Sequence, residues 1–284
     1  MWVAAPRRLR ENYGVEVVGD PWDVFAKGVV GHPLRPLLRF WFASSQWAIV
    51  RGACCVAYVT DEYLQKRYPP ERGAYSTTYS SVSLPKDLFK GPSGGVRSSE
   101  TLSIIVVGSI AQHYKGVETV LEAVARLRRA GHKATLTVVG GGPLQGHYSA
   151  LAESLGIADL VSFVGQVPPA DVRNYLDRSD VFVSASRTEG VARAAVEAMA
   201  RSKPVISTPV GGMREIVAPD GKFAVDDVDA LIRCLQRLAR DPEYYAALVD
   251  HSTRTAERFR EEILAPRRAR LYAELADRAL MGAT

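Results

Sequence analysis

The sequence predicts an α/β fold built from parallel sheets. Short, largely apolar runs typical of buried strands occupy residues 102–107, 181–184 and 205–207. Stretches with helical spacing alternate with these runs, and loops that contain glycine join them. Strands that alternate with helices form βαβ units, which bury the sheet on both faces and bind ligands at the carboxyl ends of the strands. The chain is therefore expected to form α/β domains with sites at those strand ends.

Length and composition are those of ordinary globular domains. The chain has 284 residues, of which 47% are hydrophobic and 24% charged, and this length allows one large domain or two ordinary ones, each with its own core. Cys54 and Cys55 are adjacent and Cys234 is far away, which is neither a disulfide framework nor a metal-ligand spacing. A reducing cytoplasm fits this cysteine usage best.

The formal charge of +5 at pH 7 favours an anionic partner: nucleic acid, a membrane surface or a small anionic substrate. Nucleic acid is not expected, because no basic stripe interleaved with aromatics and no nucleic-acid motif is present. No apolar run approaches the roughly 20 residues of a membrane span. The first 14 residues place arginines after a very short apolar patch, the wrong order for a signal peptide. A cytoplasmic protein is expected, with peripheral contact at the inner face of a membrane as an option.

The N-terminal part begins with a predicted strand at 15–18, a turn at 19–23 and a helix at 34–50 that follows Pro33. This helix carries a group of large aromatic side chains: Phe40, Trp41, Phe42 and Trp47. They are expected to pack in the core. The alternative is a membrane-docking face, since aromatic and basic residues mixed on one helix also bind lipid headgroups.

A strand at 54–59, a short helix to residue 68 capped by Thr60 and Asp61, and a strand at 75–84 complete this part. Residues 90–99, rich in glycine, serine and proline, have no periodicity and are interpreted as a linker.

The second part begins with the strand at 102–107, and Lys115 and Gly116 follow it before a helix that ends at Gly131. The apolar face of this helix is Val117, Val120, Leu121, Val124 and Leu127. Further strands are expected at 135–139 and 161–164, and further helices at 148–155, 171–178, 213–217, 228–240, 243–259 and 261–280, with the last interrupted by Pro266. The glycines at 140–142 do not follow the dinucleotide fingerprint, but they suit a loop that a ligand approaches closely.

Residues 186–212 carry the most chemical information. Glu189 is expected in a loop and Glu197, eight residues later, in an alanine-rich helix that starts near Val191. The N-terminus of that helix suits a pyrophosphate, Glu189 suits sugar hydroxyls, and Glu197 suits a vicinal diol such as a ribose. A lone E-x7-E is more often an ordinary amphipathic helix with a solvated glutamate, so the interpretation depends on the flanking motifs.

Six motifs in order resemble the donor-nucleotide domain of retaining GT-B glycosyltransferases of the family 4 type. They are Val107-Gly108 with Lys115-Gly116, Val139-Gly140-Gly141-Gly142-Pro143, Phe163-Val164-Gly165-Gln166-Val167, Ser179-Asp180-Val181-Phe182-Val183, Glu189-Gly190 with Glu197-Ala198-Met199-Ala200, and Gly211-Gly212 with Glu215. The resemblance implies two Rossmann-like domains facing a cleft, with the N-terminal one incomplete. It places a partial acceptor-side domain at 1–93, a donor-binding domain at 94–262 and a helix that crosses back to the first domain at 263–284.

The resemblance implies transfer of a sugar from a nucleoside diphosphate sugar to a lipid or polysaccharide acceptor, without a cofactor. It assigns Lys115 and Glu189 to catalysis, with the lysine offsetting charge on the departing diphosphate. It assigns donor binding to Ser109, Gly141, Val167, Gly190, Val191, Ala192, Arg193 and Glu197. Ser109 stands where relatives commonly carry arginine, and Gly19 stands where they often carry histidine, which leaves Asp20 as the acceptor-side residue. A D-x-D metal motif is absent, so the enzyme is expected to be metal-independent.

Other classes of protein share some of these features. A nucleotide-sugar binding protein with impaired catalysis, or a fragment of a longer enzyme, would share the donor motifs. A GT-B epimerase or phosphorylase would share the architecture. A dinucleotide oxidoreductase is disfavoured because G-x-G-x-x-G does not follow the first strand of the second part.

Overall fold

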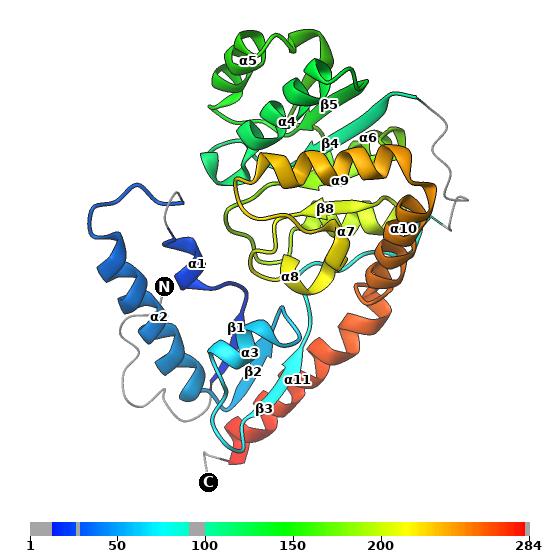
Figure 1. Cartoon of the computed structure of the whole chain (residues 1–284). Helices are drawn as coiled ribbons and strands as arrows, with labels where there is room; N and C mark the ends of the chain where they lie inside the picture. The colour runs from blue at the N-terminus through cyan, green and yellow to red at the C-terminus, as the bar shows by residue number, and fades with distance from the viewer. Residues whose placement is uncertain (1–12, 27–28, 91–99, 282–284) are drawn as a thin grey trace. The chain divides into compact units, whose positions relative to one another are not determined.

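The computed structural model describes residues 13–26, 29–90 and 100–281. The chain divides into two compact units, the first made of Met1–Ser83 with Phe259–Thr284 and the second of Leu84–Arg258. Within the second unit, the described strands form one parallel sheet in the order β6-β5-β4-β7-β8 (Figure 1). These strands are β4 (Leu102–Val107), β5 (Ala134–Val139), β6 (Val161–Gly165), β7 (Val181–Ser184) and β8 (Val205–Ser207).

The order of the strands explains how helices cover both faces of this sheet. From β4 the chain proceeds to β5 and β6 in one direction, and it then returns to β7 and β8 on the other side of β4. The helices of this unit are α4 (Val117–Arg129), α5 (Gln145–Ser154), α6 (Pro169–Arg178), α7 (Arg193–Ala200), α8 (Met213–Ile216), α9 (Val228–Arg240) and α10 (Pro242–Glu257). Because crossovers between parallel strands are right-handed, α4 and α5 cover one face of the sheet, and α6 and α7 cover the other. Of the two helices that follow, α9 packs on α4 and α10 packs on α7.

The core of the second unit forms where the apolar pattern predicts it. Helix α4 packs against α5 and α9. Its predicted apolar face is at most 2% exposed in the fold: Val117, Val120, Leu121, Val124 and Leu127. The predicted strands agree with the observed ones to within one residue, because burial on both faces of a parallel sheet selects the same apolar residues that the pattern shows.

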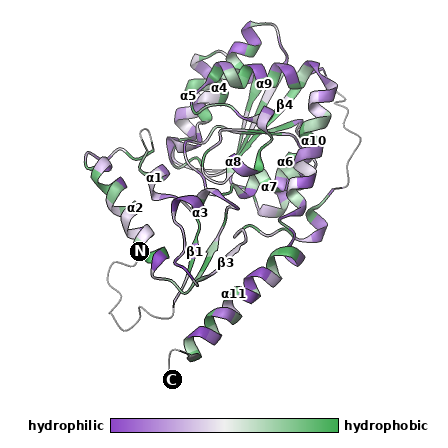
Figure 2. Ribbon diagram, turned by 60° about the horizontal axis from the view of Figure 1, so that its bottom comes forward, coloured by the Kyte–Doolittle hydropathy of each residue, from purple (hydrophilic) through white to green (hydrophobic). Residues whose placement is uncertain are grey.

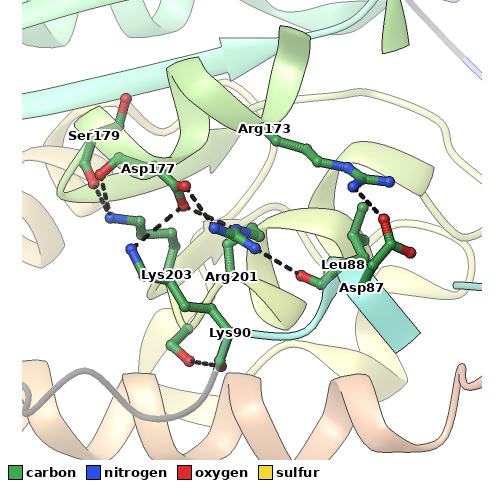
Figure 3. Close-up of polar contacts among 9 residues, drawn as sticks. Asp87, Leu88, Lys90, Arg173, Asp177, Ser179, Arg201 and Lys203 are labelled. Carbon is green, nitrogen blue, oxygen red and sulfur yellow. Dashed lines mark hydrogen bonds and ion pairs between the residues drawn. The ribbon is translucent and has the colours of Figure 1, made fainter. Parts of the chain in front are cut away.

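The boundary between the units differs from the one at residue 94 that the sequence predicts. Residues 84–90 belong to the second unit. The amide of Lys90 donates to the carbonyl of Ala200 at 2.9 Å, and Arg201 donates to the carbonyl of Leu88 at 3.1 Å (Figure 3). The rest of the predicted linker, residues 91–99, lies outside the described residues. So do the first 12 residues, for which the sequence predicts no signal peptide.

The first unit contains a parallel sheet of three described strands in the order β1-β2-β3. Its elements are β1 (Gly14–Val17), α1 (Pro21–Val24), α2 (Arg35–Arg51), β2 (Cys55–Tyr58), α3 (Tyr63–Arg67), β3 (Tyr75–Thr78) and α11 (Glu261–Met281). The predicted turn at 19–23 is one turn of helix instead. Asp20 accepts a hydrogen bond from the amide of Trp22 and Pro21 occupies the first helical position, a combination that starts a helix.

The prediction that the aromatic residues of α2 pack in the core is wrong for three of the four. Phe40, Trp41 and Trp47 are 60%, 46% and 42% exposed, whereas Phe42 is half-buried and stacks on Phe25 with ring centroids 5.1 Å apart. The reason is that α2 turns polar side chains inward: Arg39 donates to the carbonyl of Trp22, and Gln46 donates to the carbonyl of Gly19. Figure 2 shows apolar residues, coloured green, interspersed with more polar ones along α2, and several of these apolar side chains are left exposed.

Two further differences concern β3 and the last helix. The predicted strand at 75–84 ends at Thr78. Helix α11 is continuous although it contains Pro266: the proline lies near its start and removes a single amide donor, while Leu264 and Leu271 pack with Cys55 and Ala57 in the core of the first unit. Among the described residues, no helix is both long enough and apolar enough to cross a membrane.

Candidate functional site

The candidate site lies at the carboxyl ends of β4 and β7. These neighbouring strands mark the point where the strand order of the second unit reverses. In open α/β sheets, such a switch point is where ligands characteristically bind, because the loops leave it toward opposite faces. The loop after β4 carries Lys115, and the loop after β7 carries Glu189.

Lys115 and Glu189 form an ion pair across these two loops. The ammonium nitrogen Nζ lies 2.5 Å from Oε1 of Glu189, although the residues are 74 positions apart. Their side chains are 16% and 13% exposed, so water screens the pair only in part. Ser186, itself buried, donates to the same carboxylate oxygen at 2.9 Å. The fold thus brings together the two residues that the sequence assigns to catalysis.

A close approach of backbone positions Lys115. The lysine ends a short 3₁₀ turn, His113–Lys115, and Gly116 follows with φ of 64°. A Cβ atom on Gly116 would lie 2.2 Å from the carbonyl oxygen of Ala185 at the end of β7. The glycine is required both for the left-handed backbone and for contact between the two loops, which explains the Lys115-Gly116 pair seen in the sequence.

The loop after β8 supports Glu189 from its other side. The amide of Gly212 donates to the carbonyl of Gly190 at 2.7 Å. Gly211 has φ of 48°, and a Cβ atom there would lie 1.6 Å from the carbonyl oxygen of Glu189. The sequence identifies Gly211 and Gly212 as a motif but not this contact, which depends on three loops meeting at one edge of the sheet.

Glu197 is not part of the lysine–glutamate pair. It lies in the second turn of α7, and its carboxylate pairs with Arg193, one helical turn earlier, at 3.3 Å. The Glu197 side chain is 14% exposed whereas that of Arg193 is 60% exposed. Burial raises the pKa of Glu197 above its ordinary value, and the nearby Arg193 charge opposes this shift. The predicted contact of Glu197 with a ribose stays a prediction.

Helix α7 begins at Arg193, two residues later than expected. Ala192 precedes it in extended conformation, no side chain caps it, and its first turn has no acidic residue. Its amide groups therefore retain the capacity to bind an anion. Gly190 and Val191 lie in the half-buried loop that leads into it. The predicted donor-binding roles of these four residues remain predictions.

The remaining donor-side candidates lie in the loops after β4, β5 and β6. The hydroxyl of Ser109 approaches the carbonyl of Gly141 at 3.5 Å, a long and weak hydrogen bond. The amide of Ile110 donates to the same carbonyl at 3.2 Å. Val167 is half-buried just after β6. The glycines at 140–142 thus pack against the loop after β4, a structural reason for them beside the predicted approach of a ligand.

Asp20, the acceptor-side candidate, is buried in the first unit and binds several polar side chains there. It is 4% exposed, accepts hydrogen bonds from the hydroxyls of Tyr63 at 2.6 Å and Tyr68 at 2.5 Å, and pairs with Arg67 at 2.9 Å. Burial and this carboxylate raise the pKa of both tyrosines. These contacts give Asp20 a structural role in the first unit. Its predicted role toward an acceptor stays a prediction.

Comparison with known proteins supports the expected class. The family described as "Glycosyl transferases group 1" matches residues 95–255, more than half of the chain. An MMP alpha-(1->4)-mannosyltransferase of Mycolicibacterium hassiacum is 34% identical over 173 residues, which cover 60% of this chain and 41% of the relative. The chain spans about half the length of the curated relatives it matches.

Solved structures share the fold. Sucrose-phosphate synthase from Thermosynechococcus elongatus aligns with a TM-score of 0.75 at 22% identity, over 98% of this chain and 71% of the other. Alr3699/HepE from Anabaena, solved in complex with UDP and glucose, aligns with a TM-score of 0.69 at 16% identity, over 92% and 71% of the two chains. The fold is therefore α/β with parallel sheets, as in GT-B glycosyltransferases. With the family match, this establishes that the chain belongs to the group 1 family of glycosyl transferases.

Proposed function

We propose that the protein is a retaining, metal-independent glycosyltransferase that moves a sugar from a nucleoside diphosphate sugar to a lipid or polysaccharide acceptor. The observation that carries the proposal is the Lys115–Glu189 pair at the switch point of the donor-side sheet. The solved relative from Anabaena that holds UDP and glucose supports this type of donor.

The chemistry follows from the groups at this edge of the sheet. As the bond between sugar and diphosphate breaks, negative charge grows on the departing diphosphate. The Lys115 ammonium and the amides that begin α7 can stabilise that charge without a metal ion. Donor binding then releases Glu189 from its ion pair with Lys115, and the carboxylate accepts hydrogen bonds from sugar hydroxyls.

Replacement of Glu189 tests the proposal. In Glu189→Ala, release of UDP or GDP from UDP-glucose or GDP-mannose, measured with lipid and glycan acceptors, is expected to fall by about 100-fold or more. Calorimetry should show affinity for the free nucleoside diphosphate within a few fold of wild type. Glu153→Ala, a change at an exposed position of α5, is the matched control.

The outcomes separate the candidate functions. Full activity in a folded Glu189→Ala variant would remove this residue from the site. Nucleotide binding without any turnover in wild type would favour a binding protein, and isomerised donor sugar would favour an epimerase. The anomeric configuration of the product, read by NMR, tests retention, and activity in excess chelator tests metal independence.

We further propose that the exposed face of α2 contacts an anionic membrane. Phe40, Trp41 and Trp47 are exposed there, and residues 24–60 contain no aspartate or glutamate but four basic residues. Aromatic side chains on a basic, carboxylate-free helix suit the headgroup region of anionic lipids.

Vesicle sedimentation tests the membrane proposal. Wild type should bind vesicles that contain phosphatidylglycerol more tightly than vesicles of phosphatidylcholine alone, and the double variant Phe40→Ser, Trp41→Ser should lose about tenfold in affinity or more. Leu280→Ser, at a position of α11 that is 70% exposed, is the control. Equal binding by all variants, or concentration-dependent self-association through this face, would overturn the proposal.

A further inference from the structure

Arg187 is a nearly buried cation that links the loop carrying Glu189 to the turn carrying Lys115. It lies in the loop after β7, two residues before Glu189, and its side chain is 14% exposed. Sequence motifs do not single it out. In the structure its contacts reach three other segments of the second unit, so its surroundings differ from those of an ordinary surface arginine.

The first group of contacts fastens the backbone that carries Lys115. The amide of Arg187 donates to the carbonyl of Tyr114 at 2.7 Å. Its guanidinium donates to the carbonyl of His113 at 2.5 Å. Both carbonyls belong to the 3₁₀ turn that ends at Lys115. One residue thus holds the loop before Lys115 against the loop that leads to Glu189.

The second group of contacts neutralises and orients the guanidinium. Glu118, in the first turn of α4, accepts from it at 2.9 Å, and Asp226 pairs with it at 2.7 Å. The other oxygen of Glu118 accepts a hydrogen bond from Tyr148 at 3.3 Å. Because two carboxylates compensate the charge, Arg187 is arranged to hold its neighbours rather than to offer a free charge to a phosphate.

Asp226 holds the guanidinium with both of its carboxylate oxygens. Its φ of 62° lies in the left-handed region, which aspartate adopts more readily than most non-glycine residues. Its carboxylate receives two nitrogens of the guanidinium, Nη2 at 2.7 Å and Nε at 3.2 Å. This bidentate geometry requires arginine, because a lysine offers one point charge.

We propose that Arg187 is a positioning residue that sets the placement of Lys115 relative to Glu189, and that through Lys115 it sets affinity for the donor diphosphate. The proposal rests on the proposed function, in which Lys115 binds that diphosphate. Loss of Arg187 leaves the Lys115 ammonium intact but frees the turn that carries it, and small misplacements of such groups have large effects.

A double-mutant cycle on nucleotide affinity tests this coupling. Calorimetry with UDP and GDP is performed on wild type, Lys115→Ala, Arg187→Gln and the double variant. Arg187→Gln alone is expected to weaken binding by about tenfold, and the double variant should bind no more weakly than Lys115→Ala alone, since residues that act through one another are non-additive. Arg187→Lys should bind UDP and GDP little better than Arg187→Gln, because a lysine cannot make the bidentate contact with Asp226.

The controls keep the proposal separate from folding and from the proposed function. Circular dichroism at the assay temperature verifies that each variant is folded. If Arg187→Gln does not fold, Asp226→Gly, which suits a left-handed backbone and removes one partner of Arg187, replaces it in the cycle. If the losses of nucleotide affinity in the two single variants add up in the double variant, the positioning role is overturned. Unchanged affinity in Lys115→Ala would instead overturn the proposed function.

Discussion

At the residue scale, Glu197 is a carboxylate that the fold largely buries and pairs with an exposed arginine. Burial raises its pKa above the ordinary value, and Arg193 opposes that shift only in part. A group whose pKa is higher in the folded state than in the unfolded state contributes stability below the unfolded value, about 4.3 for glutamate. That contribution is lost as the pH rises through the raised pKa.

Glu197→Gln should therefore be more stable than wild type at pH 7, and the difference should shrink as the pH falls toward about 4. Thermal unfolding at a series of pH values measures this effect. Glu153→Gln, an exposed change on α5, should show no such trend. If Glu197 also binds a ribose, as the sequence predicts, the stabilised variant will bind UDP more weakly. Equal Tm differences at all pH values would contradict the burial argument.

At the element scale, the loops after β4, β7 and β8 act as one unit because backbone meets backbone among them. Gly116 contacts the end of β7, and Gly211 contacts Glu189. The three loops join different strands, so their contact depends on the parallel sheet that brings their starts to one edge. The relative placement of Lys115 and Glu189 thus depends on Gly116 and Gly211, which carry no functional group themselves but let the loops approach one another closely.

Gly211→Ala should be among the most damaging small substitutions in the chain. The methyl group would overlap the Glu189 carbonyl, and alanine in a left-handed backbone costs about 1–2 kcal/mol before any clash is counted. We expect a lower Tm and a loss of donor turnover. Gly146→Ala, in α5 with no atom within 4 Å of the added group, should be neutral or stabilise by up to about 1 kcal/mol. Wild-type Tm and turnover in Gly211→Ala would contradict the described loop contact.

At the scale of the whole molecule, a cluster of polar contacts attaches residues 84–90 to the second unit (Figure 3). Asp177 accepts two hydrogen bonds from Arg201, and Arg201 also donates to the carbonyl of Leu88. Burial alone would raise the pKa of Asp177, but the Arg201 hydrogen bonds and the charges of Lys90 and Lys203 hold it below its ordinary value. This segment is therefore expected to move with the second unit.

Asp177→Asn should loosen this attachment. The pKa of Asp177 is lower in the folded state than in the unfolded state. The ionised carboxylate therefore stabilises the fold above its unfolded pKa of about 3.9, and this contribution is lost as the pH falls through the lower folded pKa. The variant should be less stable by roughly 1–2 kcal/mol at pH 7, with a smaller difference below pH about 4. Hydrogen exchange at the Lys90 amide should accelerate. Asp159→Asn, which removes an exposed ion pair with Arg128, should change little. An unchanged exchange rate at Lys90 would refute the attachment.

The sequence by itself determined the elements of the second unit, the loop position of Glu189 and the family. Each of these depends on a local apolar pattern or on motifs that can be read along the chain. Tertiary structure alone decided the exposure of the aromatic residues on α2, the continuity of α11 through Pro266, and the contacts of Arg187. Periodicity shows that a helix has an apolar side, but whether other elements pack against that side depends on residues far away in the sequence. The contact of Lys115 with Glu189 crosses 74 residues, and the parallel sheet, rather than any local preference, makes it possible.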